Sequence, residues 1–411
     1  MQANPVTRYF RQFPLTDRIT YWYDLRAGMF FGLFNGLAIT FTGFMDSHML
    51  TLLSMSSFIG LLMNVWIGHL SEKGDKSRWV VWPGVISRFL VCLALVWVSP
   101  IAFLIVMSAY NIIATFTGPA YNSIMRSNYS NRHRGAIMAT IRIVVQIMSA
   151  MAAAAAGWFM EATPIGHQIL FPVAGVLGVC SSLTFGLIKV RKLPAAVPAA
   201  GASVLPHGFR ASLALMAKDR LFMVYMAIYF IVGFPDKLLV PLEPIRWVDE
   251  LGMNYGAAGL IQGTIPLLGA MTGYFLFIKF SHKVSPFILL GVTSLLASTR
   301  FINTALATGP YQLIPGAFLN GMGNAGWDLV PLFSIMLFVG HEKLPLYFGF
   351  FSTLVGVRGV VGPILGNLMY SAGLPIVSIY WLAFWLELGG VVLLIGFLFY
   401  FRKRKHTIAA H

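Results

Sequence analysis

The sequence predicts an all-α membrane protein with twelve transmembrane helices in two six-helix bundles and with both termini in the cytoplasm. Its composition is the first reason: 57% of the 411 residues are hydrophobic, 10% are charged and the mean hydropathy is +0.75. A water-soluble globule could not bury so much apolar surface. The second reason is the length of the apolar runs, and the third is the placement of the cations.

Twelve apolar runs are each long enough to form a helix that crosses about 30 Å of hydrocarbon at about 1.5 Å per residue. The first six predicted spans are 27–47, 50–70, 79–98, 101–125, 136–160 and 167–188. The second six are 221–244, 254–278, 285–306, 310–338, 345–369 and 376–401.

The cations lie almost entirely on one side of these spans. Of the 29 Lys and Arg residues, 23 fall in the two tails and in every second loop, whereas the opposite loops contain only Arg246. Because loops rich in Lys and Arg stay in the cytoplasm, both termini are predicted to be cytoplasmic. The net charge of +15 is therefore a topology signal. A nucleic-acid-binding protein would gather its cations on one folded face, so no nucleic-acid partner is expected.

The predicted domain organisation follows from the spans. A cytoplasmic tail with an interfacial helix near Thr16–Tyr23 covers residues 1–26, and the N-terminal six-helix bundle covers 27–190. A Pro- and Ala-rich cytoplasmic linker covers 191–218. The C-terminal bundle covers 219–402, and a short cytoplasmic tail covers 403–411.

The loop after the second span reads Gly68-His-Leu-Ser-Glu-Lys-Gly-Asp-Lys-Ser-Arg78. It resembles the loop 2–3 signature of the major facilitator superfamily, in which a Gly is followed four residues later by an acid and then by basic residues around another Gly. Glu72 stands where the family usually has Asp, and Asp75 directly follows Gly74, so the spacing departs by one residue. With the twelve spans and the linker, the resemblance covers essentially the whole chain.

The resemblance implies that this loop is a gate. An acid at the cytoplasmic rim can face the positive end of a neighbouring helix and hold one orientation of the carrier until substrate or protons bind. The gating residues would be Gly68, Glu72, Asp75 and Arg78. The alternative is that the cations of this loop determine topology alone.

Charged residues inside the spans are the principal site candidates, because each costs at least about 2.5 kcal/mol in a bilayer unless it has a partner or a wet cavity. The resemblance implies that the first, fourth, seventh and tenth helices line a cavity. It therefore places Asp236, Lys237 and Asp328 there. Adjacent residues on a helix point about 100° apart, so Lys237 is predicted to pair with Asp328, which leaves Asp236 free to bind a proton. The alternative is a purely structural Lys–Asp pair.

Four further charged positions lead to weaker predictions. Arg142 and Arg358 lie in corresponding spans of the two halves and could hold an anionic group through bidentate hydrogen bonds, or could simply clamp helices together. Arg300 and Glu387 are predicted to form a buried pair at the periphery of the second bundle.

Neutral polar and aromatic residues complete the predicted cavity. A lining that mixes amides with rings suits a small amphipathic organic molecule, although each residue alone is more often a hydrogen bond between helices. These residues are Asn35, Thr40, Asn111, Tyr121, Asn122, Asn320, Asn324 and Trp327.

Enzymatic chemistry is not supported, because no phosphate-cradling loop and no His-Glu-x-x-His spacing occur in the sequence. No cofactor and no metal site are expected. Abundant Met and the stretch Asp46-Ser-His-Met49 leave a metal or metal-chelate carrier as a lower alternative.

The leading interpretation is a secondary active transporter that moves a small organic or amphipathic solute by alternating access and uses the proton gradient. It is expected to work as a monomer in the lipid bilayer of a bacterial cytoplasmic (inner) membrane. Drug antiporters of the superfamily usually carry Gly-Pro on the fifth span, whereas this chain has Gly362-Pro363 on the eleventh, so the branch is not assigned. The alternative from another class is a membrane assembly factor or receptor that does not transport.

Overall fold

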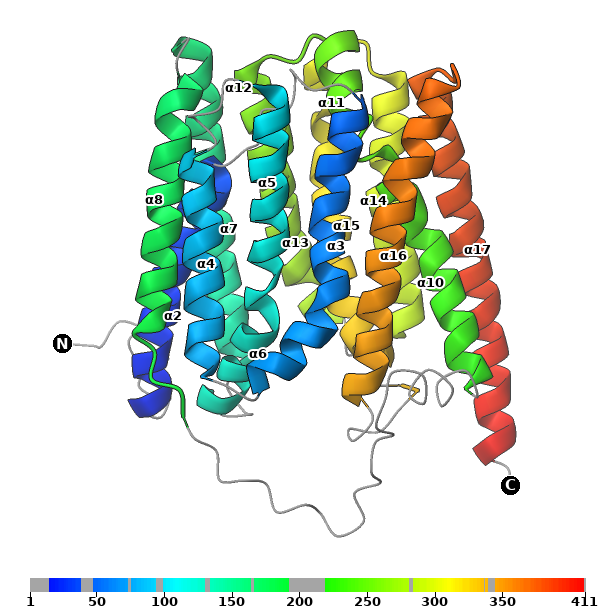
Figure 1. The fold of residues 1–411 in the computed structure, drawn as a ribbon. Coiled ribbons are helices and arrows are strands. Elements are labelled where there is room, and N and C mark those ends of the chain that lie inside the picture. The colour runs from blue at the N-terminus through cyan, green and yellow to red at the C-terminus, as the bar shows by residue number, and fades with distance from the viewer. Residues whose placement is uncertain are drawn as a thin grey trace, which may run out of the picture. The chain divides into compact units, whose positions relative to one another are not determined.

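The computed structural model describes residues 15–37, 47–72, 75–93, 99–129, 134–163, 166–191, 219–280, 284–335, 337–338 and 344–409. Within these ranges every regular element is a helix (Figure 1). Each of the twelve predicted ranges overlaps a helix. The first part of the chain contains α2 (Leu15–Leu37), α3 (Ser47–Glu72), α4 (Lys76–Leu93), α5 (Pro100–Thr115), α6 (Thr117–Asn128), α7 (Arg134–Ala162) and α8 (Gly166–Gly186).

The second part begins with α10 (Arg220–Leu239) and contains several short or irregular elements. In order it has α10, α11 (Glu243–Ile245), η1 (Arg246–Glu250), α12 (Tyr255–Ala258), η2 (Gly259–Thr264), α13 (Ile265–Phe280), α14 (Pro286–Leu306), η3 (Pro310–Leu313), α15 (Ile314–Ile335), α16 (Leu344–Ser371) and α17 (Ile376–Ala409). The π-helical turns η1 and η2 lie between α11 and α13, one on each side of α12.

The chain divides into two compact units. Unit 1 comprises residues 1–40 and 59–197, and unit 2 comprises residues 41–58 and 198–411. In unit 1, α2 packs against α7 and α8, and α4 packs against α8 and α5. In unit 2, α14 packs against α15 and α17, while α10 packs against α16 and α17. These last five helices position the candidate site.

The first helix begins earlier than the sequence indicated. A span was expected at 27–47 after a separate interfacial helix, but α2 runs without a break from Leu15 to Leu37. The reason is that its polar residues have partners inside unit 1: Asp17 and Asp24 are buried, and Asp24 accepts a hydrogen bond from Tyr129. Charges that looked like a solvated tail are part of the packed helix.

The fourth predicted span, 101–125, is two helices that meet at Phe116. Pro119 lies in the first turn of α6 and has no N–H to donate to the carbonyl of Thr115, so a continuous helix would lose a hydrogen bond there. The chain instead makes a turn in which the Phe116 N–H donates to the carbonyl of Ile113 at 3.1 Å.

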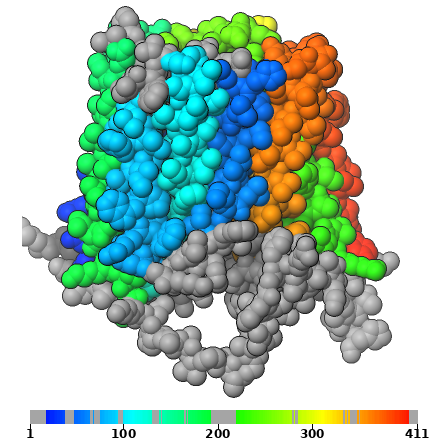
Figure 2. All heavy atoms as spheres, in the orientation of Figure 1, coloured from blue at the N-terminus to red at the C-terminus, as the bar shows by residue number. Residues whose placement is uncertain are grey.

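Eight helical segments within the described ranges are long and apolar enough to cross a membrane. Their outer surfaces are also apolar. In unit 1, Trp82 is 61% exposed on α4 and Ile105 is 64% exposed on α5, and both helices lie at the surface in Figure 2. In unit 2, Trp385 and Phe399 are exposed on α17. Such surfaces are stable against lipid chains and not against water, so the protein is an integral, multi-pass membrane protein.

Candidate functional site

Unit 2 contains a cavity of about 220 Å³ whose lining is polar and apolar in equal parts. Five helices contribute to it: α10, α14, α15, α16 and α17. The lining residues are Val232, Gly233, Asp236, Lys237, Ala297, Phe301, Asn320, Asn324, Trp327, Asp328, Arg358 and Glu387.

The charged end of α10 follows a proline. Pro235 lies inside the helix and cannot donate a backbone hydrogen bond to the carbonyl of Ile231. The next two residues are Asp236 and Lys237, which both line the cavity. The proline therefore interrupts the backbone hydrogen-bond ladder just where the helix carries its two charges.

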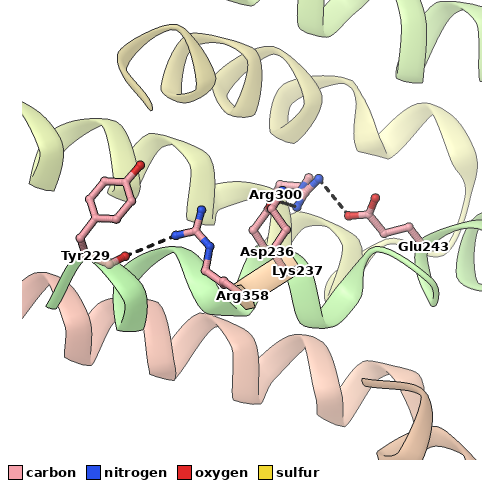
Figure 3. Close-up of polar contacts among 6 residues, drawn as sticks. All are labelled: Tyr229, Asp236, Lys237, Glu243, Arg300 and Arg358. Carbon is pink, nitrogen blue, oxygen red and sulfur yellow. Dashed lines mark hydrogen bonds and ion pairs between the residues drawn. The ribbon is translucent and has the colours of Figure 1, made fainter. Parts of the chain in front are cut away.

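Asp236 is the centre of a network of ion pairs (Figure 3). Its carboxylate lies 2.6 Å from Nζ of Lys237 and 2.6 Å from Nη2 of Arg300 on α14. Arg300 in turn reaches Glu243 through Nη1 at 2.9 Å. Two acids and two bases thus neutralise one another in a group of four, which is what buried charges require in a membrane.

Arg358 on α16 is a buried cation that has no carboxylate partner in the described part of the chain. Arg358 is 5% exposed, and no Asp or Glu oxygen among the described residues lies within 4.0 Å of its guanidinium. Nη1 donates to the backbone carbonyl of Tyr229 at 3.3 Å, whereas Nε is buried without an acceptor (Figure 3). The rings of Tyr229 and Trp327 each lie 5.5 Å from its Cζ atom.

Gly233 makes room for this guanidinium. A Cβ atom at Gly233 would overlap Nη1 of Arg358 and lie 2.6 Å from Cζ. It would also lie 2.9 Å from the ring of Trp327. Only glycine allows Arg358 to lie against α10 at this position.

The polar face of α15 forms another wall of the cavity. Asn320, Asn324 and Trp327 are spaced four and three residues apart, so they project from one side of the helix. Asp328 adjoins them and accepts a hydrogen bond from the Tyr274 hydroxyl on α13 at 2.5 Å. The wall combines two amides, one ring and one acid.

Glu387 on α17 is a buried acid on the cavity lining. Glu387 is 2% exposed, and its side chain has no hydrogen-bond or ion-pair partner among the described residues. It is also the one acid of α17 (Ile376–Ala409). The charged lining of the cavity therefore includes Asp236 and Lys237 from the neutral group of four, and Asp328 with its tyrosine partner. It also includes Glu387 and Arg358, which have no ion pair among the described residues.

No protein-family profile and no curated protein sequence match the chain. Solved structures do match along nearly its full length. A crystal structure of a point mutant of the nucleoside transporter NupG matches with a TM-score of 0.72 at 14% identity, covering 92% of this chain and 99% of that one. An auto-inhibited peptide transporter of the POT family matches with a TM-score of 0.66 at 14% identity, covering 95% and 97%. A bacterial homologue of the human lysosomal transporter Spinster, inward-facing and occupied, matches with a TM-score of 0.59 at 17% identity, covering 98% of each chain.

The chain has the major facilitator fold. The resemblance that the loop after the second span indicated is therefore confirmed at the level of the fold, with the branch unassigned. Identities of 14% to 17% carry the fold alone and not a substrate.

Within the major facilitator fold, the structure brings together seven of the residues that the sequence singled out. Six lie on the seventh and tenth predicted spans and one lies on the eleventh. These are Asp236, Lys237, Asn320, Asn324, Trp327, Asp328 and Arg358.

Two predicted pairings were wrong. Lys237 pairs with its neighbour Asp236 and not with Asp328, and Asp236 is therefore not free. The expectation rested on the 100° angle between adjacent residues, but long side chains can bend toward each other across that angle, particularly beside a proline. Arg300 pairs with Asp236 and Glu243, not with Glu387, which lines the cavity instead of lying at the periphery.

The other predicted cavity residues belong to unit 1 and have different surroundings. Asn35 is exposed, with Nδ2 3.5 Å from the Ser149 hydroxyl, and Asn122 is exposed on α6. Asn111 is half-buried and Arg142 is exposed. Thr40 lies outside the described residues.

Of the predicted gating residues, Asp75 and Arg78 can be placed. Asp75 precedes α4, and its carboxylate accepts a hydrogen bond from the backbone N–H of Ser77 at 3.0 Å, as a helix-capping acid does. The same carboxylate lies 3.5 Å from Nε of the exposed Arg78. The side-chain surroundings of Gly68 and Glu72 lie outside the described residues.

A second group of titratable residues in unit 1 was not predicted as a cluster. Asp24 on α2 accepts hydrogen bonds from the hydroxyls of Tyr129 at 2.9 Å and Tyr121 at 3.5 Å. Asp24 precedes the predicted first span, and α2 is not among the eight described helical segments that are long and apolar enough to cross a membrane. Burial raises the pKa of Asp24 from 3.8 to about 6, although the two tyrosine hydrogen bonds oppose this shift. Only Tyr121 had been named from the sequence.

Proposed function

We propose that this protein is a secondary active transporter of a small organic solute, that the unit 2 cavity binds the solute, and that transport is coupled to protons. The observation that carries the proposal is a polar, charged cavity inside a bundle of apolar membrane helices. An unpaired ionisable group inside a membrane is destabilising, so its presence usually reflects function. Arg358 and Glu387 are two such groups.

The size and lining of the cavity support a small solute. At about 220 Å³ it is smaller than the ~300–1,000 Å³ typical of sites for drug-sized ligands. Its two amides, one indole ring and several charges suit an organic molecule with polar groups better than a bare ion. The similar structures that are named as nucleoside and peptide transporters also move small organic solutes.

Glu387 is the best-placed proton carrier. A group that couples transport to protons must lose and gain its charge during the cycle, and a strong ion pair resists that change. Asp236 is held by two cations at 2.6 Å each, whereas Glu387 has no ion pair among the described residues. We therefore assign proton binding to Glu387 and a structural role to Asp236.

Access to the cavity would alternate between the two sides of the membrane, as the major facilitator fold allows. The sequence contains no nucleotide-binding loop that would indicate energy from nucleotide hydrolysis. In this proposal the proton gradient supplies the energy. Neither a cofactor nor a protein partner is needed for this cycle.

Flux into proteoliposomes tests the proposal. The purified protein is reconstituted at about one molecule per vesicle. A proton gradient is then imposed, and uptake of radiolabelled organic anions, cations and neutral solutes is measured. We expect gradient-driven accumulation of at least one class, and a collapse of accumulation when a protonophore is added. If no solute accumulates under either polarity of the gradient, the transporter proposal is wrong and a non-transporting membrane factor becomes the better interpretation.

A further inference from the structure

We infer that the solute is a small organic carboxylate, that Arg358 binds its carboxylate group, and that protonation of Glu387 makes room for this negative charge. The inference rests on the proposed function and adds the class of substrate and the way in which proton and solute are linked.

Arg358 has the geometry of an anion-binding group. Its guanidinium carries five N–H donors, and the Tyr229 carbonyl is its one hydrogen-bond acceptor among the described residues. The two rings at 5.5 Å and the bare Cα of Gly233 hold the guanidinium plane in place. A planar, immobilised fork with free donors matches a carboxylate, which accepts two parallel hydrogen bonds.

The remainder of the cavity fits the body of such a molecule. The Trp327 ring lies beside Arg358 and offers an apolar surface to a chain or a single ring. The amides of Asn320 and Asn324 follow along α15 and can bond to further polar atoms of the solute. A volume of about 220 Å³ limits the solute to roughly the size of one ring with its substituent.

Charge balance links this site to Glu387. Asp236, Glu243, Lys237 and Arg300 already neutralise one another. The cavity lining also holds Arg358 as a cation and two further carboxyl groups: Asp328, which accepts a hydrogen bond from Tyr274, and Glu387, which has no ion pair among the described residues. A second anion beside Arg358 would leave excess negative charge in a poorly hydrated space, unless Glu387 takes up a proton.

Charged groups from three other helices face Glu387. They are Asp236 on α10, Arg300 on α14 and Arg358 on α16. Lys237 and Asp328 complete the charged lining of the cavity. When a solute carboxylate occupies Arg358, the positive charge of Arg358 is compensated, so a second negative charge on Glu387 no longer has that cation beside it. Solute binding and proton binding therefore strengthen each other, and by equal factors.

Equilibrium binding to the purified protein tests the inference without requiring transport. The probes are benzoate and pentanoate, with benzamide and benzylamine as neutral and cationic matches and phenyl phosphate as a different oxyanion. Benzoate stays ionised between about pH 6 and about pH 8, so any pH dependence of its binding belongs to the protein. We expect a carboxylate to bind while benzamide and benzylamine do not. We also expect its affinity to rise by up to tenfold per pH unit as the pH falls, because one proton is taken up with each solute.

Variants assign the two roles. Arg358→Gln and Arg358→Lys should each weaken carboxylate binding at least tenfold, whereas Arg191→Gln, which alters an exposed arginine of unit 1, should not. Glu387→Gln should keep binding and remove its pH dependence, whereas Glu161→Gln on the exposed part of α7 should leave that dependence intact. If the Arg358 variants do not fold, the pH dependence of the unaltered protein and of Glu387→Gln still decides.

Several outcomes would overturn the inference. Binding of benzylamine or benzamide in place of both carboxylates would show a different substrate class, and stronger binding of phenyl phosphate would identify a phosphate site. Failure of both carboxylates at millimolar concentration, or equal pH dependence in Glu387→Gln, would also refute it. Gradient-driven flux of a non-carboxylate in proteoliposomes would refute the substrate class while leaving the transporter proposal intact. Binding of a carboxylate without any flux would refute the transporter proposal while leaving the carboxylate site intact.

Discussion

The backbone of Gly233 lies directly against the guanidinium of Arg358, so closely that a methyl group at Gly233 would be 2.6 Å from the Arg358 Cζ atom. This contact joins α10 to α16 at the wall of the cavity. The position of the Arg358 side chain, which we propose binds the solute, therefore depends on Gly233 having no side chain. A change at Gly233 is thus a change in where Arg358 points.

Gly233→Ala should displace Arg358 and weaken carboxylate binding at least tenfold, equivalent to about 1.4 kcal/mol. Alanine is a better helix former than glycine, so α10 itself should still form. Gly396→Ala in α17 is the matched control, since a Cβ atom there meets nothing within 4 Å. Isothermal titration with benzoate measures both variants. Equal affinity in Gly233→Ala and the control would show that Arg358 does not contact the solute.

Asp236→Asn should destabilise the protein and not merely uncouple it. The substitution leaves Lys237 and Arg300 with one carboxylate, Glu243, and because these charges are only partly buried we expect a loss of stability below the ~3–5 kcal/mol of a fully buried pair, about 1–3 kcal/mol. The double variant Asp236→Asn with Lys237→Gln restores neutrality and keeps the Arg300 pair with Glu243, so part of the lost stability should return. Thermal unfolding in detergent compares them. A single variant as stable as the unaltered protein, but without proton-driven accumulation, would return the coupling role to Asp236.

Asn128 should prove to be a structural residue of unit 1. Its amide donates to the Thr20 hydroxyl at 3.3 Å and the Lys189 carbonyl at 3.0 Å, and accepts from the Arg191 N–H at 2.9 Å. Asn128→Ala should lower the free energy of unfolding by about 2 kcal/mol, because it removes three hydrogen bonds made by a buried amide, each of which contributes about 0.5–1.5 kcal/mol. Asn122→Ala changes an exposed amide of the same helix and should be nearly neutral. Similar losses in both variants would contradict this role.

Asp24 should make unit 1 more stable in mild acid. Its folded-state pKa of about 6 lies above the ordinary value of 3.8, so the native protein binds the proton more tightly than the unfolded chain does. Stability is then highest below about pH 4, falls as the pH rises toward about 6, and is constant above that value, with a total change of up to about 3 kcal/mol. Asp24→Asn should abolish this part of the pH dependence. An unchanged pH profile of the melting temperature in Asp24→Asn would assign the dependence to another group.

The positions of the helices could be predicted well because the membrane imposes a simple rule on them. A span needs about 20 apolar residues, and the runs near α14 and α17 meet that requirement almost residue for residue. The start of α2 escaped the rule, since Asp17 and Asp24 look solvated in a sequence but are buried by tertiary contacts. The break at Phe116 was marked by Pro119, whose significance depends on its position within the helix.

The sequence predicted which residues line the cavity better than it predicted which charged residues pair with one another. Charges within apolar runs directed attention to Asp236 and Arg358 because a bilayer tolerates few of them. Which charges meet depends on helix rotation and on side-chain bending, and neither is encoded in residue spacing. Glu387 shows the difficulty: it is the lone acid of α17, a clear signal, but its place on the cavity follows from the packing of α17 against α10 and α14.

The ion pair between Asp236 and Lys237 has a consequence for biogenesis. The two residues are adjacent in one helix, so α10 carries its own counter-charge when it leaves the translocon, before the ribosome has synthesised Arg300. The helix can enter lipid with this pair nearly neutral, and Asp236 keeps Lys237 and gains Arg300 as a second partner once α14 is inserted. Asp236 therefore has a counter-charge from the moment its helix is synthesised, before the later helix supplies Arg300.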